Sequence, residues 1–204
     1  MASLCDWQND GQLNAKHAVP SSLESLLQTL GNAVTDSAAQ DLLKTTAANY
    51  AKWWTDYFSI QHDPSDLHGE TNHFRYRTRD WHLVRIEDAD VDLFELAKIV
   101  VATQLLSVDL MVSLPNNAAW SSKLPGDVKV TIESQQDLAK RLAKMSNGSI
   151  RFIGDYDVQT MAPSEIGNTP IVRSQVLNNG RLELLNYLRE QSMTEIVHRY
   201  GNIV

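Results

Sequence analysis

The spacing of apolar residues first predicts two helices near the start of the chain. Residues 21–31 begin with two serines that can cap a helix and end at Gly31, which can stop one. A longer helix is predicted over 36–60, because its apolar residues recur at steps of three and four. Its end carries an aromatic cluster, which favours packing on the rest of the domain over exposure as a docking face: Trp53, Trp54, Tyr57 and Phe58.

Strict alternation over residues 71–79 predicts a strand with two unlike faces. Arg75 and Arg77 make one face basic, whereas Phe74 and Tyr76 make the other aromatic. Beyond this strand, short apolar runs alternate with helical patterns, which is typical of parallel strands joined by helices. The predicted strands are 82–86, 109–114, 128–132, 150–153 and 170–172, and the predicted helices are 92–107 and 134–145.

This order of elements predicts an α/β fold: a Rossmann-like parallel sheet with flanking helices, an appended β-flap and N-terminal helices. We expect the flap strands near 71–79 and 191–199. Residues 1–20 have no periodicity and are interpreted as a linker or a severed connection. The expected organisation is then 21–62 for the N-terminal helices and 63–204 for the Rossmann-like domain with its flap.

Composition narrows the classes of partner. The 204 residues carry a formal net charge of -7, which argues against a nucleic-acid partner. No apolar run approaches the roughly 18 residues of a membrane span, and no signal peptide is evident, so a cytoplasmic location is expected. The single cysteine, Cys5, lies in a polar segment beside Asp6 and is interpreted as an incidental thiol rather than a nucleophile.

The predicted sheet lacks the usual signature of a dinucleotide site. A glycine-rich turn would follow the first parallel strand, but residues 87–98, which follow Ile86, contain no glycine. Carboxylates stand there instead, and they would repel a phosphate: Glu87, Asp88, Asp90 and Asp92. A divalent-cation site is the less favoured alternative for these acids. We therefore expect no catalytic residue, no metal and no cofactor in this chain.

Four separated stretches carry more specific combinations of residues. They are YAKWWTDYFSIQHD (50–63), HGETNHFRYR (68–77), DLFELAKIVVATQLLSVDLMVSLP (92–115), and NGRLELLNYLREQS with the closing HRYGN (179–202). In this order they resemble the bifunctional proline-utilisation enzymes (PutA) and the long 1-pyrroline-5-carboxylate dehydrogenases. The resemblance implies a C-terminal domain of the aldehyde-dehydrogenase superfamily type.

In that family the domain is non-catalytic and packs on the dehydrogenase module, which oxidises L-glutamate γ-semialdehyde with NAD. The implied partner is therefore the dehydrogenase module of the same polypeptide or of another protomer, and a homo-oligomer is possible. The parent protein would be an enzyme of proline catabolism, whereas this chain alone lacks the catalytic cysteine and glutamate of the module.

The resemblance also implies which residues dock on the partner. Arginine and tyrosine are enriched in interfaces, and the segment from Asn179 onward is rich in both. The predicted docking residues are Arg75, Tyr76, Arg77, Arg181, Arg189, His198, Arg199 and Tyr200. Leu182, Leu185 and Leu188 are expected to pack on the domain's own core, and truncation at Asn179 is expected to leave the central sheet folded.

Three alternatives stay open at this point. The C-terminal strand could simply be solvated, with exposed charges that contribute little. The chain could be a self-standing oxidoreductase or nucleotide-binding protein with a degenerate Rossmann site. It could also be an unrelated protein–protein adaptor.

Overall fold

A computed structural model describes residues 18–34, 36–63, 65, 70–87, 93–154 and 169–196. The N-terminal part contains α1 (Ser21–Ala33) and α2 (Ser37–Trp53), which continues as a π-helical turn, Trp54–Phe58. The remaining helices and strands follow in this order: β1 (Glu70–Thr78), β2 (Trp81–Ile86), α3 (Leu93–Leu106), β3 (Asp109–Leu114), a 3-10 turn (Ala119–Lys123), β4 (Lys129–Ile132), α4 (Gln135–Leu142), β5 (Gly148–Ile153), β6 (Ile171–Val172), α6 (Gly180–Glu183), a 3-10 turn (Leu184–Tyr187) and β7 (Leu188–Ile196).

Five strands form a parallel sheet in the order β4-β3-β2-β5-β6. The order reverses at β2, the first strand of the sheet along the chain, as it does in doubly wound folds. The α/β fold class predicted from the sequence is therefore confirmed.

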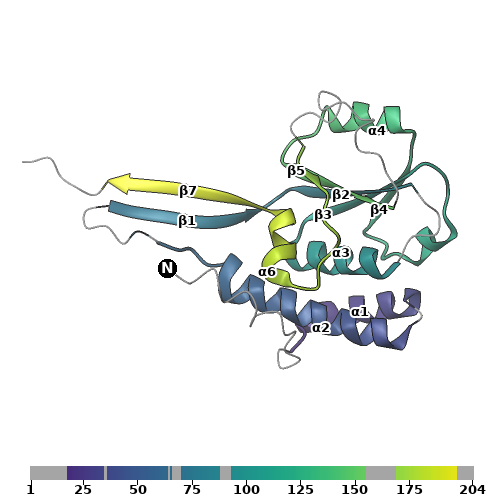
Figure 1. The fold of residues 1–204 in the computed structure, drawn as a ribbon, viewed down its shortest axis with the longest axis horizontal. Coiled ribbons are helices and arrows are strands. Elements are labelled where there is room, and N and C mark those ends of the chain that lie inside the picture. The colour runs from purple at the N-terminus through teal and green to yellow at the C-terminus, as the bar shows by residue number, and fades with distance from the viewer. Residues whose placement is uncertain are drawn as a thin grey trace, which may run out of the picture.

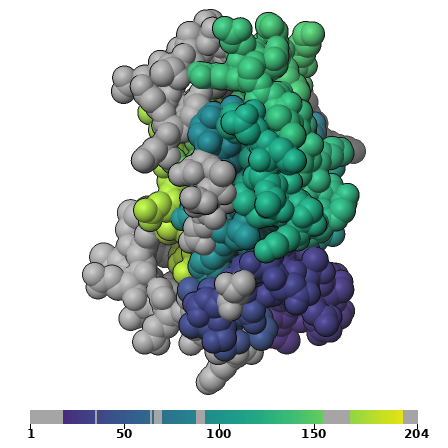
Figure 2. All heavy atoms as spheres, turned by 90° about the vertical axis from the view of Figure 1, so that its right-hand side faces the viewer, coloured from purple at the N-terminus to yellow at the C-terminus, as the bar shows by residue number. Residues whose placement is uncertain are grey.

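The sheet lies between two helical layers (Figure 1). Helix α4 covers one face over Trp81, Leu83 and Ile150. Helix α3 covers the other face, and α1 and α2 pack on the far side of α3 within the same hydrophobic core. This position explains why α3 is apolar nearly all round, since it is buried on both sides. Figure 2 looks onto the side facing away from the ribbon, where α1 and α2 (purple) form the lower layer.

Helix starts follow the local sequence with one exception. Asp36 caps α2 by accepting from the backbone N–H groups of Ala38 and Ala39, and Ser134 caps α4 by accepting from that of Asp137. The expectation of a serine cap on the first helix is wrong. Pro20 occupies the cap position of α1 without a side-chain bond, because the helix begins one residue earlier than a Ser21 cap requires.

Strands β1 and β7 form a separate antiparallel ribbon, the predicted flap. Glu70 pairs with Ile196 at the outer end, and Thr78 pairs with Leu188 at the base. The ribbon projects from the body on the side opposite to the carboxyl ends of the sheet strands (Figure 1). Among the described residues, no helix is long and apolar enough to cross a membrane.

Candidate functional site

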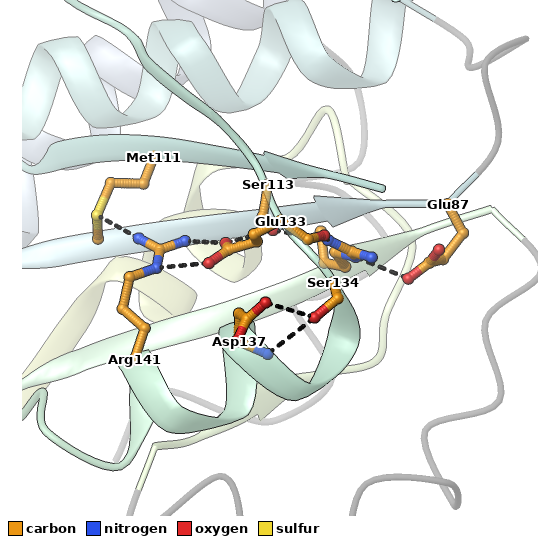
Figure 3. A network of polar contacts seen from close by, with 8 residues as sticks. Glu87, Met111, Ser113, Glu133, Ser134, Asp137 and Arg141 are labelled. Carbon is orange, nitrogen blue, oxygen red and sulfur yellow. Dashed lines mark hydrogen bonds and ion pairs between the residues drawn. The ribbon is translucent and has the colours of Figure 1, made fainter. Parts of the chain in front are cut away.

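The carboxyl edge of a parallel sheet is where doubly wound folds bind ligands. In this chain that edge carries Arg85, whose side chain is almost fully buried. Its Nε donates to Glu87 at 2.7 Å, and its Nη1 donates to Ser113 Oγ at 2.9 Å and to the Glu133 carbonyl at 3.0 Å. Figure 3 labels Glu87, Ser113 and Glu133, the three residues to which Arg85 donates.

Glu133 extends the same network toward α4. Its carboxylate accepts from Ser113 Oγ at 2.6 Å and from Nε of Arg141 at 3.2 Å, and it also pairs with the Arg141 Nη2 (Figure 3). Two arginines and two glutamates thus satisfy one another at the switch point of the sheet. A phosphate bound there would have to displace these internal partners.

Among the described residues, the cavity at this edge is small. The cavity bounded by Ile86, Glu87, Leu114 and the residues 115–118 has a volume of about 50 Å³. Pockets for small ligands commonly measure about 300–1,000 Å³. Of the predicted acidic cluster, Glu87 pairs with Arg85, while Asp88, Asp90 and Asp92 lie outside the described residues. The part of the chain that is described contains no group of side chains suited to a metal ion.

A second buried network joins the sheet to the base of the ribbon. Arg151 of β5 pairs with Glu183 of α6 at 2.7 Å, and both side chains are fully buried. Glu183 also accepts from the Tyr187 hydroxyl at 2.8 Å and from the Leu177 backbone N–H at 3.0 Å. Because β7 begins at Leu188, this network fixes the point from which the ribbon leaves the body.

His82 lies beside this network in complete burial. Its Nδ1 is 2.8 Å from Ser149 Oγ, and its ring packs edge-on against Tyr187. Burial, together with the positive charges of Arg151 and Arg79, lowers the pKa of His82 well below its ordinary value. The imidazole is therefore neutral in the folded protein at neutral pH.

The ribbon places the predicted docking residues on two faces. Arg77 stands directly opposite Arg189, and Arg75 stands opposite Gln191, so the three arginines share one face. Tyr76 projects from the other face, where it contacts Phe58, Tyr57 and Phe74. Burial among these groups and a hydrogen bond with Tyr57 raise the pKa of Tyr76.

Arg181 lies against the aromatic cluster. Its guanidinium is 5.2 Å from the centre of the Trp53 ring, a cation–π distance. The cluster itself is mixed: Phe58 is buried, as expected for a packed face, whereas Tyr57 is 36% exposed. His198, Arg199 and Tyr200 lie outside the described residues.

The two edges of the ribbon differ. The outer edge of β1 is occupied, because Phe74 exchanges two backbone hydrogen bonds of 2.8 Å with His62, and Asp63 accepts from the Asn72 N–H. Since Phe74 directs its backbone groups away from β7, its partner Ser192 directs its own groups to the outer edge of β7. Glu190 and Thr194 share that orientation, and β7 has no second neighbouring strand among the described residues.

The expected apolar stripe of the C-terminal segment is confirmed at Leu188 and is wrong at Leu185. Leu184, Tyr187 and Leu188 are buried, whereas Leu185 is 41% exposed. The cause is that α6 ends at Glu183 and tightens into a 3-10 turn, which shifts the buried face. Truncation at Asn179 would remove these buried residues, and the expected survival of the central sheet stays a prediction.

Sequence reasoning missed the buried arginines and their partners. The signal was present, because Arg85 and Arg151 each interrupt a short strand that is otherwise apolar. A charge on a strand buried on both faces requires a partner. Which partner it finds depends on segments far away in the chain.

Fold and edge together define an α/β protein with a Rossmann-like sheet, and the described residues at the carboxyl edge of this sheet form internal ion pairs. No protein-family model and no curated protein sequence matches the chain. The chain is similar to proline utilization A (PutA) from Corynebacterium freiburgense, with a TM-score of 0.55 and 23% identity over 91% of this chain and 16% of that chain. At that identity the likeness shows a shared fold.

Two other solved structures are less similar. PutA from Bdellovibrio bacteriovorus has a TM-score of 0.42 and 15% identity, over 62% of this chain and 15% of that chain. An NAD-dependent benzaldehyde dehydrogenase from Corynebacterium glutamicum has a TM-score of 0.42 and 11% identity, over 74% of this chain and 36% of that chain. The chain spans about a sixth of the first PutA chain.

Proposed function

We propose that this chain is a non-catalytic domain that docks on, and completes, the L-glutamate γ-semialdehyde dehydrogenase module of a proline-catabolism enzyme. The observation that carries the proposal is the ribbon, whose β7 edge has no second strand among the described residues. An isolated two-stranded ribbon is marginally stable in water, and an unpaired edge favours pairing with another strand. The likeness of fold to PutA supports the choice of partner.

Docking would add a strand of the dehydrogenase module to β7. The outward backbone groups of Glu190, Ser192 and Thr194 would supply the hydrogen bonds. Met193 and Ile196, which are 44% and 64% exposed, would bury apolar surface at the same time. NAD would bind in the partner module, and this chain would hold no cofactor.

The internal contacts at the carboxyl edge favour a structural role for this chain over dinucleotide binding. Arg85 and Glu133 already satisfy each other there through Ser113 and backbone groups. Titration calorimetry with NAD on the chain alone should therefore give no heat of binding. Micromolar affinity would instead favour a nucleotide-binding function.

A proline at Ser192 tests the docking edge directly. Because the Ser192 N–H points away from β1, Ser192→Pro removes a docking donor without breaking a ladder bond of the ribbon. Affinity for the dehydrogenase module of the same organism should fall roughly tenfold or more, as expected for one lost buried hydrogen bond and a steric clash. Isothermal calorimetry measures it.

The matched control is Ser192→Thr, which keeps the N–H and suits a strand. It should bind like the wild type. Equal affinity of the proline and threonine variants would show that β7 does not pair with the partner.

A further inference from the structure

The arginine face of the ribbon is a local concentration of positive charge in an acidic chain. We define it by Arg75, Arg77 and Arg189, with Arg79 at its base. We infer that this face binds carboxylates of the partner protein, and that the partner strand beside β7 places an Asp or Glu next to Arg189. The identity of the partner rests on the proposed function, whereas the chemistry rests on the ribbon itself.

The register of the ribbon sets like charges against each other. Arg77 and Arg189 are direct cross-strand partners, and Arg75 lies two residues farther along the same face. Like charges directly opposite one another destabilise a strand pair. The ribbon therefore carries a repulsion that its own stability does not require.

None of these three arginines forms an ion pair with a described residue. Arg75 donates instead to neutral groups: its Nε to Gln191 Oε1 at 2.8 Å and its Nη2 to Met193 Sδ at 3.6 Å. Elsewhere in the described structure cations do find carboxylates, in the pairs Lys44–Asp41, Lys52–Asp56, Arg85–Glu87, Lys129–Asp109, Lys140–Asp137, Arg141–Glu133 and Arg151–Glu183. The positive charges of Arg75, Arg77 and Arg189 are therefore not balanced by a carboxylate among the described residues.

The repulsion reaches the base of the ribbon. Arg79 donates from Nη1 to the Gly148 carbonyl at 3.3 Å, but its buried Nε has no hydrogen-bond partner. Burial and the charge of Arg189 lower the pKa of Arg79. An anion against Arg189 would relieve this interaction as well.

A protein carboxylate fits this face better than a nucleic acid. The whole chain has a net charge of -7, so its long-range field repels a polyanion. Next to the arginines the ribbon offers an open strand edge and exposed Met193 and Ile196, which suit a protein strand. Guanidinium groups bind single carboxylates in a bidentate manner, which suits recognition of an Asp or Glu side chain.

A binding role and a structural role of the arginines predict opposite changes in melting temperature, so both melting temperature and affinity are measured. In Arg77→Gln/Arg189→Gln both charges are lost while the strand is kept. Because a repulsion is removed, the melting temperature should stay the same or rise. Affinity for the dehydrogenase module should fall about tenfold at low salt, and its salt dependence should flatten. Lys129→Gln/Lys140→Gln, exposed charges outside the ribbon, is the matched control and should bind like the wild type.

If the wild type and the arginine double variant bind the module with equal affinity and equal salt dependence, carboxylate recognition is refuted while docking stands. If the wild type does not bind the module, docking fails and a second probe decides on the arginine face. A short oligoglutamate peptide should bind the wild type and not the double variant at low salt. Binding to neither, or a preference for a short oligothymidylate, would overturn the inference.

Discussion

The buried ion pair at the base of the ribbon gives the sharpest stability prediction. Glu183 is 0% exposed and forms an ion pair with the guanidinium of Arg151. Its carboxylate also accepts hydrogen bonds from the Tyr187 hydroxyl and the Leu177 backbone N–H. Glu183→Ala leaves the Arg151 charge buried without a partner. Removing one member of a buried pair costs about 3–5 kcal/mol.

That loss is large compared with the roughly 5–15 kcal/mol that stabilises a typical domain. For a chain of this size each kcal/mol shifts the melting temperature by about 2–4 °C, so a fall of roughly 6–20 °C is expected. Urea denaturation followed by tryptophan fluorescence measures the free energy of unfolding, and an unchanged slope shows that the comparison is valid.

Glu195→Ala is the control, because Glu195 is an exposed carboxylate on β7. It should change the free energy of unfolding by less than about 0.5 kcal/mol. If Glu183→Ala is as stable as this control, Arg151 is not held in a dry site, and the ribbon is not anchored through Glu183.

Three further predictions concern other parts of the fold. Gly148→Ala should lower the free energy of unfolding by about 3 kcal/mol or more, because the added Cβ would lie 2.0 Å from the Trp81 ring. Gly126→Ala is the control, because the space around Gly126 is open, and it should leave the free energy of unfolding unchanged in the same denaturation experiment. Gly180→Ala should also destabilise, since its Cβ would lie 2.9 Å from the Tyr50 backbone; thermal melting that matches the wild type would contradict the packing of α6 on α2. The pKa of His82 is depressed in the folded protein. Below about pH 6.5 the unfolded chain therefore binds a proton at His82 that the folded chain does not. The contribution of His82 to the free energy of unfolding is full above that pH and declines below it. Between about pH 6.5 and 5.5 the wild type should lose roughly 1 kcal/mol more than His82→Asn, and identical pH profiles of the two would show that His82 is solvated.

Much of the fold could be predicted because its cause is local. The parallel strands are short and mostly apolar, α3 is apolar on nearly all sides, and the alternation of residues 71–79 gives the two faces of β1. The structure adds the reason that α3 must be apolar all round, which is that α1 and α2 cover its outer side.

The parts that failed depend on long-range packing. The register of the C-terminal segment changes because α6 is only one turn long and Gly180 approaches the backbone of α2. No periodicity in residues 180–188 reports that neighbour. For the same reason Arg85 and Arg151 could be suspected from the sequence, but their partners Glu133 and Glu183 could not be assigned.

The predicted docking set is divided by strand alternation. Arg75, Arg77 and Arg189 share one face, while Tyr76 and the nearby Arg181 belong to the aromatic side. Sequence proximity of residues 75–77 hides this division, because neighbouring residues on a strand point to opposite faces. Two different contacts with a partner are therefore expected rather than one.

The proposed role of this chain is to complete a dehydrogenase through its ribbon. The most direct measurement is the rate of NAD-dependent oxidation of L-glutamate γ-semialdehyde by the dehydrogenase module, with and without this chain. The wild-type chain should raise the rate, and a variant ending at Leu188, which keeps the buried core residues Leu184 and Tyr187, should not. If the module is equally active alone, with the wild-type chain and with the shortened chain, this chain does not complete the dehydrogenase.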